Sequence, residues 1–402
     1  MVSIDAFAHN QRFLLAASDI VLYSKNFYLS QKFCHRYSSN MNKMVPLSSM
    51  SRYVRGHHLL YSNSKQLHQS LLRASWSMNT SACNGHTPFS FSSKTADDES
   101  TMRSPINVAF VGLGNMGRQM ALNLAKPNDD LPPFHLTVHD LQESNVSSFF
   151  QHAERIEGLV DSSSLSAASD LTSVGESSPD FVITSLPTCE ASEDVVGDIV
   201  QSLPPMTNQN DKNGCTFIDT STISPNVSKK LHQLVTSVSP HHDYVDAPVS
   251  GGVKGATDGT LTFMVGCSSP KIFSNVQPLL QRMGKNMIPC GGPGSGSAVK
   301  LCNNTALAAQ MLGICEAMNL GDALGVDPTV LAGVMNASTA KCWSSEVNNP
   351  HPAAAKEIGS GASMNGYEGG FGTALMLKDL NLAVDAGEEE GLALPVAGLT
   401  RD

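Results

Sequence analysis

The sequence contains no stretch of 18 consecutive apolar residues, so it predicts no membrane-spanning helix. Its nine cysteines are scattered along 402 residues and none forms a Cys-x-x-Cys pair. This spacing fits reduced thiols better than a disulfide framework or a zinc site, and no metal centre is expected. Acidic residues outnumber basic ones, and the resulting net charge of −10 argues against nucleic acid as the main partner.

The first 95 residues are almost free of acidic side chains. Up to Thr95 the only acids are Asp5 and Asp19, while serine, asparagine and basic residues are frequent. A serine-rich, arginine-containing, acid-poor N-terminus is typical of an organellar transit peptide. A disordered tail without a targeting role would have the same composition. Residues 1–104 are therefore predicted to be a transit peptide or a disordered tail outside the folded part.

From Ile106 the pattern changes to alternating strands and helices. The apolar run Ile106–Val111 lies between Pro105 and Gly112, as expected of a buried parallel strand. Further strand-like runs follow at 135–139, 180–186, 215–219, 244–246 and 261–265. Helical patterns occur at 115–126, 193–203 and 225–238. This alternation predicts an α/β domain with a mostly parallel, doubly wound sheet over residues 105–293.

The strand pattern stops after Pro293. Residues 298–324 carry apolar side chains at helical spacing and many alanines, which predicts one long, largely buried helix. Helical patterns recur at 328–336 and 375–390. Residues 294–402 are therefore predicted to form a separate all-α domain.

A glycine string follows the first strand directly and opens a helix. It consists of Gly112, Leu113, Gly114, Asn115, Met116 and Gly117. In a Gly-x-Gly-x-x-Gly string the glycines allow a tight turn, approach of a pyrophosphate and close helix–strand packing. Asp140 follows the second strand about 20 residues later, where an acid can bind a ribose 2′-hydroxyl and repel a 2′-phosphate. The string predicts NAD rather than NADP; alternatively, Asp140 caps the next helix.

Lys300 and Asn304 are the candidate catalytic pair. They are four residues apart, so they share one face of the long predicted helix, just after a glycine-rich approach. Burial and a nearby positive nicotinamide lower the pKa of a lysine, which would let Lys300 accept a proton from an alcohol. Asn304 can donate a hydrogen bond to the same oxygen. The alternative is a lysine whose amine snorkels to the surface.

The turn Ser250-Gly251-Gly252 is a candidate substrate site because it follows a predicted strand. Consecutive glycines expose backbone N–H groups, and Ser250 adds a hydroxyl, so the turn can hold a carboxylate. An ordinary strand-to-helix turn that needs positive φ at glycine would have the same sequence.

Two further strand ends and one charged pair complete the candidates. Leu186 and Pro187 end one strand and Thr222 follows the next, and strand ends of this class line the cofactor cleft. Ordinary turns would explain them equally well. Lys378 precedes Asp379 in an apolar helical pattern, where it could reach the cofactor or a substrate carboxylate, or form a surface ion pair.

In combination and in this order, these strings resemble the β-hydroxyacid dehydrogenase family from about residue 106 to the C-terminus. The resemblance implies a Rossmann domain joined through a long helix to an all-α domain, in dimers or tetramers. It implies catalysis by Lys300, substrate orientation by Asn304, and a domain cut short at Asp402, where relatives continue through further helix. It assigns substrate binding to Ser250, Gly251 and Gly252, and NAD contacts to Leu186, Pro187, Thr222 and Lys378.

The function that the resemblance implies is NAD-dependent oxidation of a small hydroxy acid. The leading hypothesis is oxidation of 3-hydroxyisobutyrate to methylmalonate semialdehyde, a step of valine breakdown in the mitochondrial matrix. One alternative is a reductase of glyoxylate, succinic semialdehyde or tartronate semialdehyde, which an NADP preference would favour and Asp140 disfavours. Another is a non-catalytic nucleotide-binding relative, whose expected sign would be loss of the lysine; Lys300 is present.

Overall fold

The computed structural model describes residues 105–126, 134–156, 164–205 and 214–402. The predicted transit segment, 1–104, lies outside these ranges. Strands and helices first alternate in the order β1 (Ile106–Val111), α3 (Asn115–Ala125), β2 (Phe134–His139), α4 (Glu143–Ala153), β3 (Leu165–Ala167), α5 (Leu171–Glu176), β4 (Phe181–Thr184), α6 (Cys189–Ser202), β5 (Thr216–Asp219), α7 (Pro225–Val238) and β6 (Asp243–Asp246). The chain continues with β7 (Val249–Ser250), α8 (Gly252–Asp258), β8 (Leu261–Gly266), α9 (Pro270–Met283) and β9 (Gly284–Gly291).

The strands form one sheet in the order β3-β2-β1-β4-β5-β6-β8-β7, with β9 beside β8. Neighbours from β3 to β6 are all parallel, whereas β8 runs antiparallel to both β6 and β7. The winding direction changes at β1, between β2 and β4. Sheets of this type bind ligands at such a point, beyond the carboxyl ends of the strands. The predicted doubly wound, mostly parallel sheet is confirmed.

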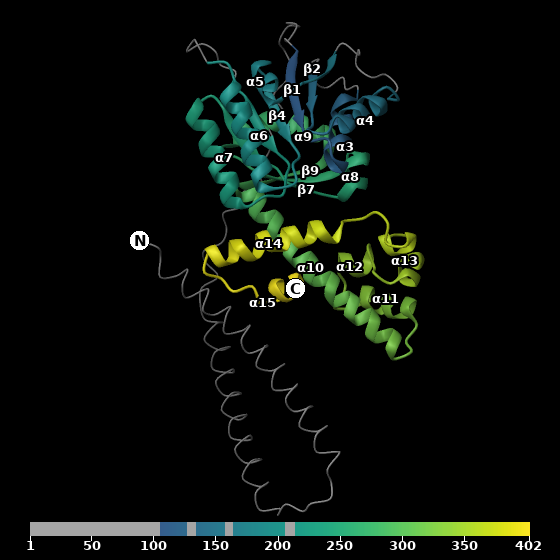
Figure 1. Cartoon of the computed structure of the whole chain (residues 1–402). Coiled ribbons are helices and arrows are strands. Elements are labelled where there is room, and N and C mark those ends of the chain that lie inside the picture. Colours follow the sequence, from purple (N-terminus) through teal and green to yellow (C-terminus); the bar gives the residue numbers. More distant parts are fainter. Residues whose placement is uncertain (1–104, 127–133, 157–163, 206–213) are drawn as a thin grey trace, which may run out of the picture. The chain divides into compact units, whose positions relative to one another are not determined.

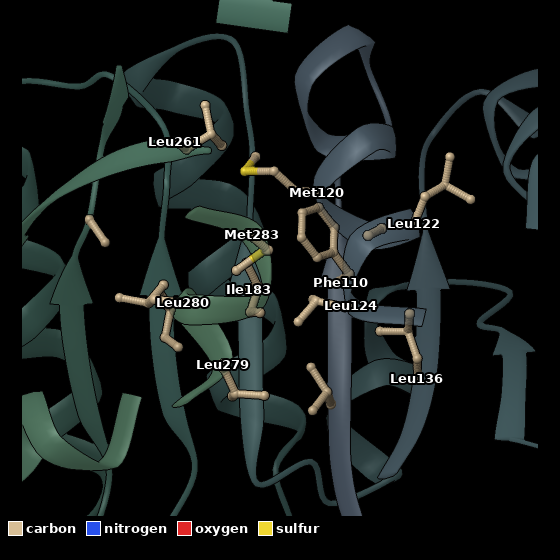
Figure 2. Packing of buried hydrophobic residues seen from close by; sticks show 14 of the residues in the cluster. Phe110, Met120, Leu122, Leu124, Leu136, Ile183, Leu261, Leu279, Leu280 and Met283 are labelled. Carbon is tan, nitrogen blue, oxygen red and sulfur yellow. The ribbon is translucent and has the colours of Figure 1, made fainter. Parts of the chain in front are cut away.

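Helices cover both faces of the sheet, with α5, α6 and α7 on one side and α3, α4 and α8 on the other (Figure 1). Side chains alternate along β1, so Val108 and Phe110 enter one apolar core while Ala109 and Val111 enter the other. Figure 2 shows the first core, where Phe110 lies among residues of α3, β2 and α9. The two cores hold β1 and its following loop in a fixed position.

The sequence patterns missed or shifted several elements of the α/β part. The predicted strand 180–186 stops at Thr184, and the predicted helix 193–203 begins four residues earlier as α6. Its start is set by Thr188, whose Oγ1 accepts a hydrogen bond from Ala191 N at 3.1 Å. The serine-rich segment after residue 164 contains β3 and α5. There Ser173 and Asp170 form a capping box, so polar composition conceals a helix start.

Residues 292–402, all of them described, contain helices and no strand. These are α10 (Ser295–Ala323), α11 (Pro328–Ala337), α12 (Trp343–Glu346), α13 (Pro352–Ile358), the 3-10 helix η2 (Ala362–Asn365), α14 (Thr373–Glu389) and α15 (Pro395–Arg401). Helix α10 packs against β8 at the sheet and against α14, α11 and α12 beyond it. None of the helices in the described ranges is both long and apolar enough to cross a bilayer.

The expectation of a largely buried long helix was wrong for this single chain. Helix α10 buries Lys300, Leu301, Asn304, Ala308 and several residues farther along, but most of its 29 residues are exposed or half-buried. Leu320 is 60% exposed. The apolar residues of α10 surround the helix, while the neighbouring helices cover only part of its circumference.

Candidate active site

The glycine loop after β1 has the shape that the sequence predicted. Gly112 has φ of +93°, a value that side-chain-bearing residues rarely adopt. A Cβ on Gly117 would overlap the Gly112 carbonyl oxygen, so this glycine lets α3 pack directly against the turn. A Cβ on Gly114, in contrast, would meet no atom within 4 Å. Space is therefore left open at the middle glycine and filled by backbone at the other two.

The start of α3 fits an anionic group. Gly114 is its N-cap and provides no side-chain cap for the N–H groups of the first turn, which includes Asn115 and Met116. Uncapped N–H groups and the helix dipole attract a negative charge. Together with the open space at Gly114, they can hold the pyrophosphate of a dinucleotide.

Asp140 follows β2 and faces the same loop. Its Oδ2 accepts a hydrogen bond from Leu113 N at 2.6 Å. Its Oδ1 accepts from Gln142 N at 2.8 Å and from Asn145 Nδ2 at 3.1 Å, at the start of α4. The N-cap of α4 is Gln142, without a side-chain cap, so Asp140 is not the helix cap of the alternative interpretation. Its carboxylate bonds the chain beside that cap and ties the end of β2 to the glycine loop.

The residues predicted to contact the cofactor at the next strand ends converge on one lysine. The Lys378 Nζ donates to the Thr222 carbonyl oxygen at 2.7 Å and to the Pro187 carbonyl oxygen at 3.4 Å. Leu186 N in turn donates to Ser221 Oγ at 2.8 Å, which joins the two strand ends. Lys378 therefore does more than form an ion pair with its neighbour. Its Nζ connects α14 to the loops after β4 and β5.

Lys300 lies one turn into α10 and is only 7% exposed, which contradicts the snorkelling alternative. Burial lowers the pKa of its amine, and the neighbouring Lys378 cation lowers it further, whereas the Asp379 carboxylate acts in the opposite direction. Burial is the largest of these effects. The neutral amine that a proton acceptor needs is thus favoured relative to an exposed lysine.

Asp379 is a site residue that the sequence did not identify as one. It is 3% exposed, and its Oδ2 accepts a hydrogen bond from Asn304 Nδ2 at 2.6 Å. Asn303 Nδ2 donates to the Asn304 Oδ1 at 3.1 Å, so both ends of the Asn304 amide are fixed. The second N–H of that amide has no partner within the described part of the chain. The position of Asp379 beside Lys378 in an apolar pattern was the available signal, but its partner lies 75 residues away.

The Ser250–Gly252 turn joins β7 to α8. Gly251 and Gly252 have φ of +133° and +63°, and Ser250 pairs with Thr262 of β8. The turn therefore meets the positive-φ requirement of the ordinary-turn interpretation, and Gly251 is exposed at the strand end. Among the described residues no hydrogen bond joins this turn to Lys300 or Asn304.

The described residues contain no group of three or more His, Cys, Asp or Glu side chains that could hold a metal ion.

The same substitution should have different effects at Gly114 and at Gly117 of the loop. Gly117→Ala would force a methyl group into the Gly112 carbonyl oxygen, so we expect a lower melting temperature. Gly114→Ala places its methyl group in open space, so we expect normal unfolding with weakened dinucleotide binding. Thermal unfolding and titration with NAD measure the two effects. Unchanged NAD affinity in Gly114→Ala would show that the dinucleotide does not approach this glycine.

Comparison with known families divides the chain as its architecture does. Residues 107–292 match the NAD binding domain of 6-phosphogluconate dehydrogenase. Residues 294–402 match the family described as NAD-binding of NADP-dependent 3-hydroxyisobutyrate dehydrogenase. The two matches meet between β9 and α10.

Individual relatives lead to the same family. The mitochondrial 3-hydroxyisobutyrate dehydrogenase of Mus musculus is 40% identical over 286 residues, covering 71% of this chain and 77% of the relative. A probable mitochondrial 3-hydroxyisobutyrate dehydrogenase of Arabidopsis thaliana is 38% identical over 298 residues, covering 72% and 79%. The solved 3-hydroxyisobutyrate dehydrogenase of Mycobacterium tuberculosis, determined with L-serine, is 34% identical with a TM-score of 0.62, covering 74% and 92%. This chain therefore belongs to the 3-hydroxyisobutyrate dehydrogenase family.

Proposed function

We propose that this protein catalyses the NAD-dependent oxidation of 3-hydroxyisobutyrate to methylmalonate semialdehyde, a step of valine breakdown. The observation that carries the proposal is the buried Lys300, one helical turn from an Asn304 whose amide is fixed by Asp379. A lysine kept out of water on the helix that follows a dinucleotide-binding sheet is suited to accept an alcohol proton. The family of the chain supports this reaction over others.

Lys300 and the residues around it have separate roles in the proposed oxidation. The Lys300 Nζ accepts the proton of the substrate hydroxyl, and the second N–H of Asn304 donates to the same oxygen and holds it in register. NAD, when bound, supplies the acceptor for the hydride that leaves the carbinol carbon. The N–H groups and hydroxyl of Ser250, Gly251 and Gly252 hold the substrate carboxylate, which fixes the carbon that reacts.

Cofactor binding is assigned to the glycine loop and to the strand ends beside it. Gly112, Leu113, Gly114, Asn115, Met116 and Gly117 would hold the pyrophosphate, and Leu186, Pro187, Thr222 and Lys378 would line the nicotinamide half. The Asp140 carboxylate supports NAD over NADP because it would repel a 2′-phosphate. Residues 105–293 then form the NAD-binding domain, and residues 294–402 the helical domain.

A steady-state panel of small hydroxy acids with NAD and with NADP tests the proposal. We expect 3-hydroxyisobutyrate with NAD to give the highest kcat/KM. Lys300→Ala should abolish turnover while NAD binding persists. The matched control Lys254→Ala should retain turnover, because the Lys254 side chain is exposed and forms an ion pair with Asp258 on the same helix. Equal rates on all hydroxy acids, a strong NADP preference, or near-normal turnover by folded Lys300→Ala would each contradict the proposal.

The pH dependence of kcat follows from the pKa shift of Lys300. Only the neutral amine accepts a proton, so oxidation should be slow at low pH and rise as Lys300 deprotonates, below the range of an ordinary lysine. The Asp379 carboxylate raises this pKa, so Asp379→Asn should move the rising limb to lower pH. Asp258→Asn, an exposed carboxylate on α8, should leave it in place. A limb that stays fixed or moves upward in Asp379→Asn would rule out Lys300 as its origin.

We also propose that the protein acts in the mitochondrial matrix as a dimer or tetramer. The acid-poor segment 1–104 supports import, and the curated relatives compared above are named mitochondrial. Exposed apolar side chains on three helices support assembly, among them Leu320, Val334 and Leu399. Import of the full chain into isolated mitochondria and sedimentation of the purified enzyme test the two parts. A monomer at micromolar concentration, or a chain that is not imported, would contradict the corresponding part.

A further inference from the structure

The helix that carries Lys300 has no cap of its own. Its N-cap is Gly294, with φ of +85° and no side chain, so the N–H groups of the first turn need acceptors from elsewhere. Ser295 N donates to the Gly292 carbonyl oxygen at 3.0 Å. Asp246, at the end of β6 and 48 residues before Gly294, accepts from the N–H of the N-cap and from the third N–H of the helix. Its Oδ1 accepts from Gly294 N at 2.7 Å and its Oδ2 accepts from Ser297 N at 2.8 Å.

The contact between Asp246 and α10 is closely packed. Asp246 is 1% exposed, and a Cβ on Gly266, its register partner in β8, would lie 2.5 Å from the Asp246 Oδ1. A Cβ on Gly296 would lie 2.7 Å from the Asp246 carbonyl oxygen. Ser297 also forms a hydrogen bond of 2.9 Å with Ser228 of α7 through their hydroxyl groups. The first turn of α10 is thus fixed on several sides, with the carboxylate at its end.

The location of this carboxylate connects the two ends of the proposed site. Ser297 lies one helical turn before Lys300, on the same side of α10. Ser250, in the turn assigned to the substrate carboxylate, follows Asp246 by four residues along the chain. A displacement of the first turn of α10 would therefore change where Lys300 lies relative to the Ser250–Gly252 turn.

We propose that Asp246 is a positioning residue whose carboxylate fixes Lys300 relative to the substrate turn; this inference rests on the proposed function. A serine at the N-cap would cap the helix without burying a charge, and a buried carboxylate is costly unless it is well bonded. Burial raises the pKa of Asp246 to about 6, while its bonds to Ser297 N and Gly294 N act in the opposite direction. At neutral pH the group is mainly the carboxylate, which can accept both bonds at once.

The variant Asp246→Asn tests the role because an amide has only one acceptor oxygen. Whichever way the amide is turned, one of the two N–H groups faces an NH₂ group. We expect kcat to fall by about 10²-fold, as expected when a reacting group is misplaced by about 1 Å. The KM for the hydroxy acid should change much less, and NAD affinity should be unchanged. Hydrogen exchange of the Gly294 and Ser297 amides should become faster.

Two controls separate positioning from general stability. Asp243→Asn makes the same change at the other end of β6, where the carboxylate bonds Ser268 and lies beside His232, and should leave kcat unchanged. If Asp246→Asn does not fold, Gly266→Ala places a methyl group against both the Asp246 Oδ1 and the Gly296 N. It disturbs the same contact with α10 without removing the charge and should lower kcat in the same way. Gly313→Ala, in open space on α10, is its control.

The possible outcomes decide between the role and its alternatives. Wild-type kcat in folded Asp246→Asn or Gly266→Ala, or a lower kcat with unchanged exchange at Gly294 and Ser297, would overturn the positioning role. A wild-type enzyme that oxidises none of the hydroxy acids would instead overturn the proposed function. The amide exchange of the two variants would then still show whether Asp246 anchors α10.

Discussion

The burial of one amine is the constraint on which the rest of the site depends. Removing Lys300 from water disfavours its charged form, and this cost is what makes the amine a better proton acceptor. The surrounding structure must also keep the amine buried, because a lysine on a mobile helix would turn its amine toward solvent. The site is therefore built to hold α10 still, and the polar contacts around it serve that purpose.

Those contacts come from distant parts of the chain. Asp379 of α14 fixes Asn304, and Lys378 reaches across to the carbonyl oxygens of Thr222 and Pro187 at the strand ends. These two adjacent residues of α14 also form an ion pair, with the Lys378 Nζ 3.5 Å from the Asp379 Oδ1. Asp379 bonds α10 and Lys378 bonds the loops after β4 and β5, so the pair joins the two. Helix α14 therefore connects the surroundings of Lys300 to the loops proposed to bind NAD. A displacement of either would change the position of the other.

The parts of this arrangement that follow from local sequence were predictable. The glycine loop, Lys300 with Asn304, and the alternation of strands and helices each express a spacing within a few residues. Asp379 and Asp246 could not be found in this way, because their roles depend on hydrogen-bond partners that lie 75 and 48 residues away in the sequence. Strand β9 was missed for a related reason: Gly284–Gly291 is mostly exposed or half-buried and lacks an apolar pattern. Pairing with β8, not composition, makes it a strand.

The exposed surface of α10 is a feature that the spacing of apolar residues could not predict. Apolar residues around a helix indicate that it will be covered, but not whether the cover belongs to the same chain. Here α11, α12, α14 and α15 cover part of it, and Leu312 and Leu320 remain in contact with solvent. The helix that carries Lys300, the proposed proton acceptor, is then also the helix with exposed apolar side chains. If a second copy of the chain covers that surface, it further restrains α10. Assembly and the proposed catalysis would then both depend on the position of this helix.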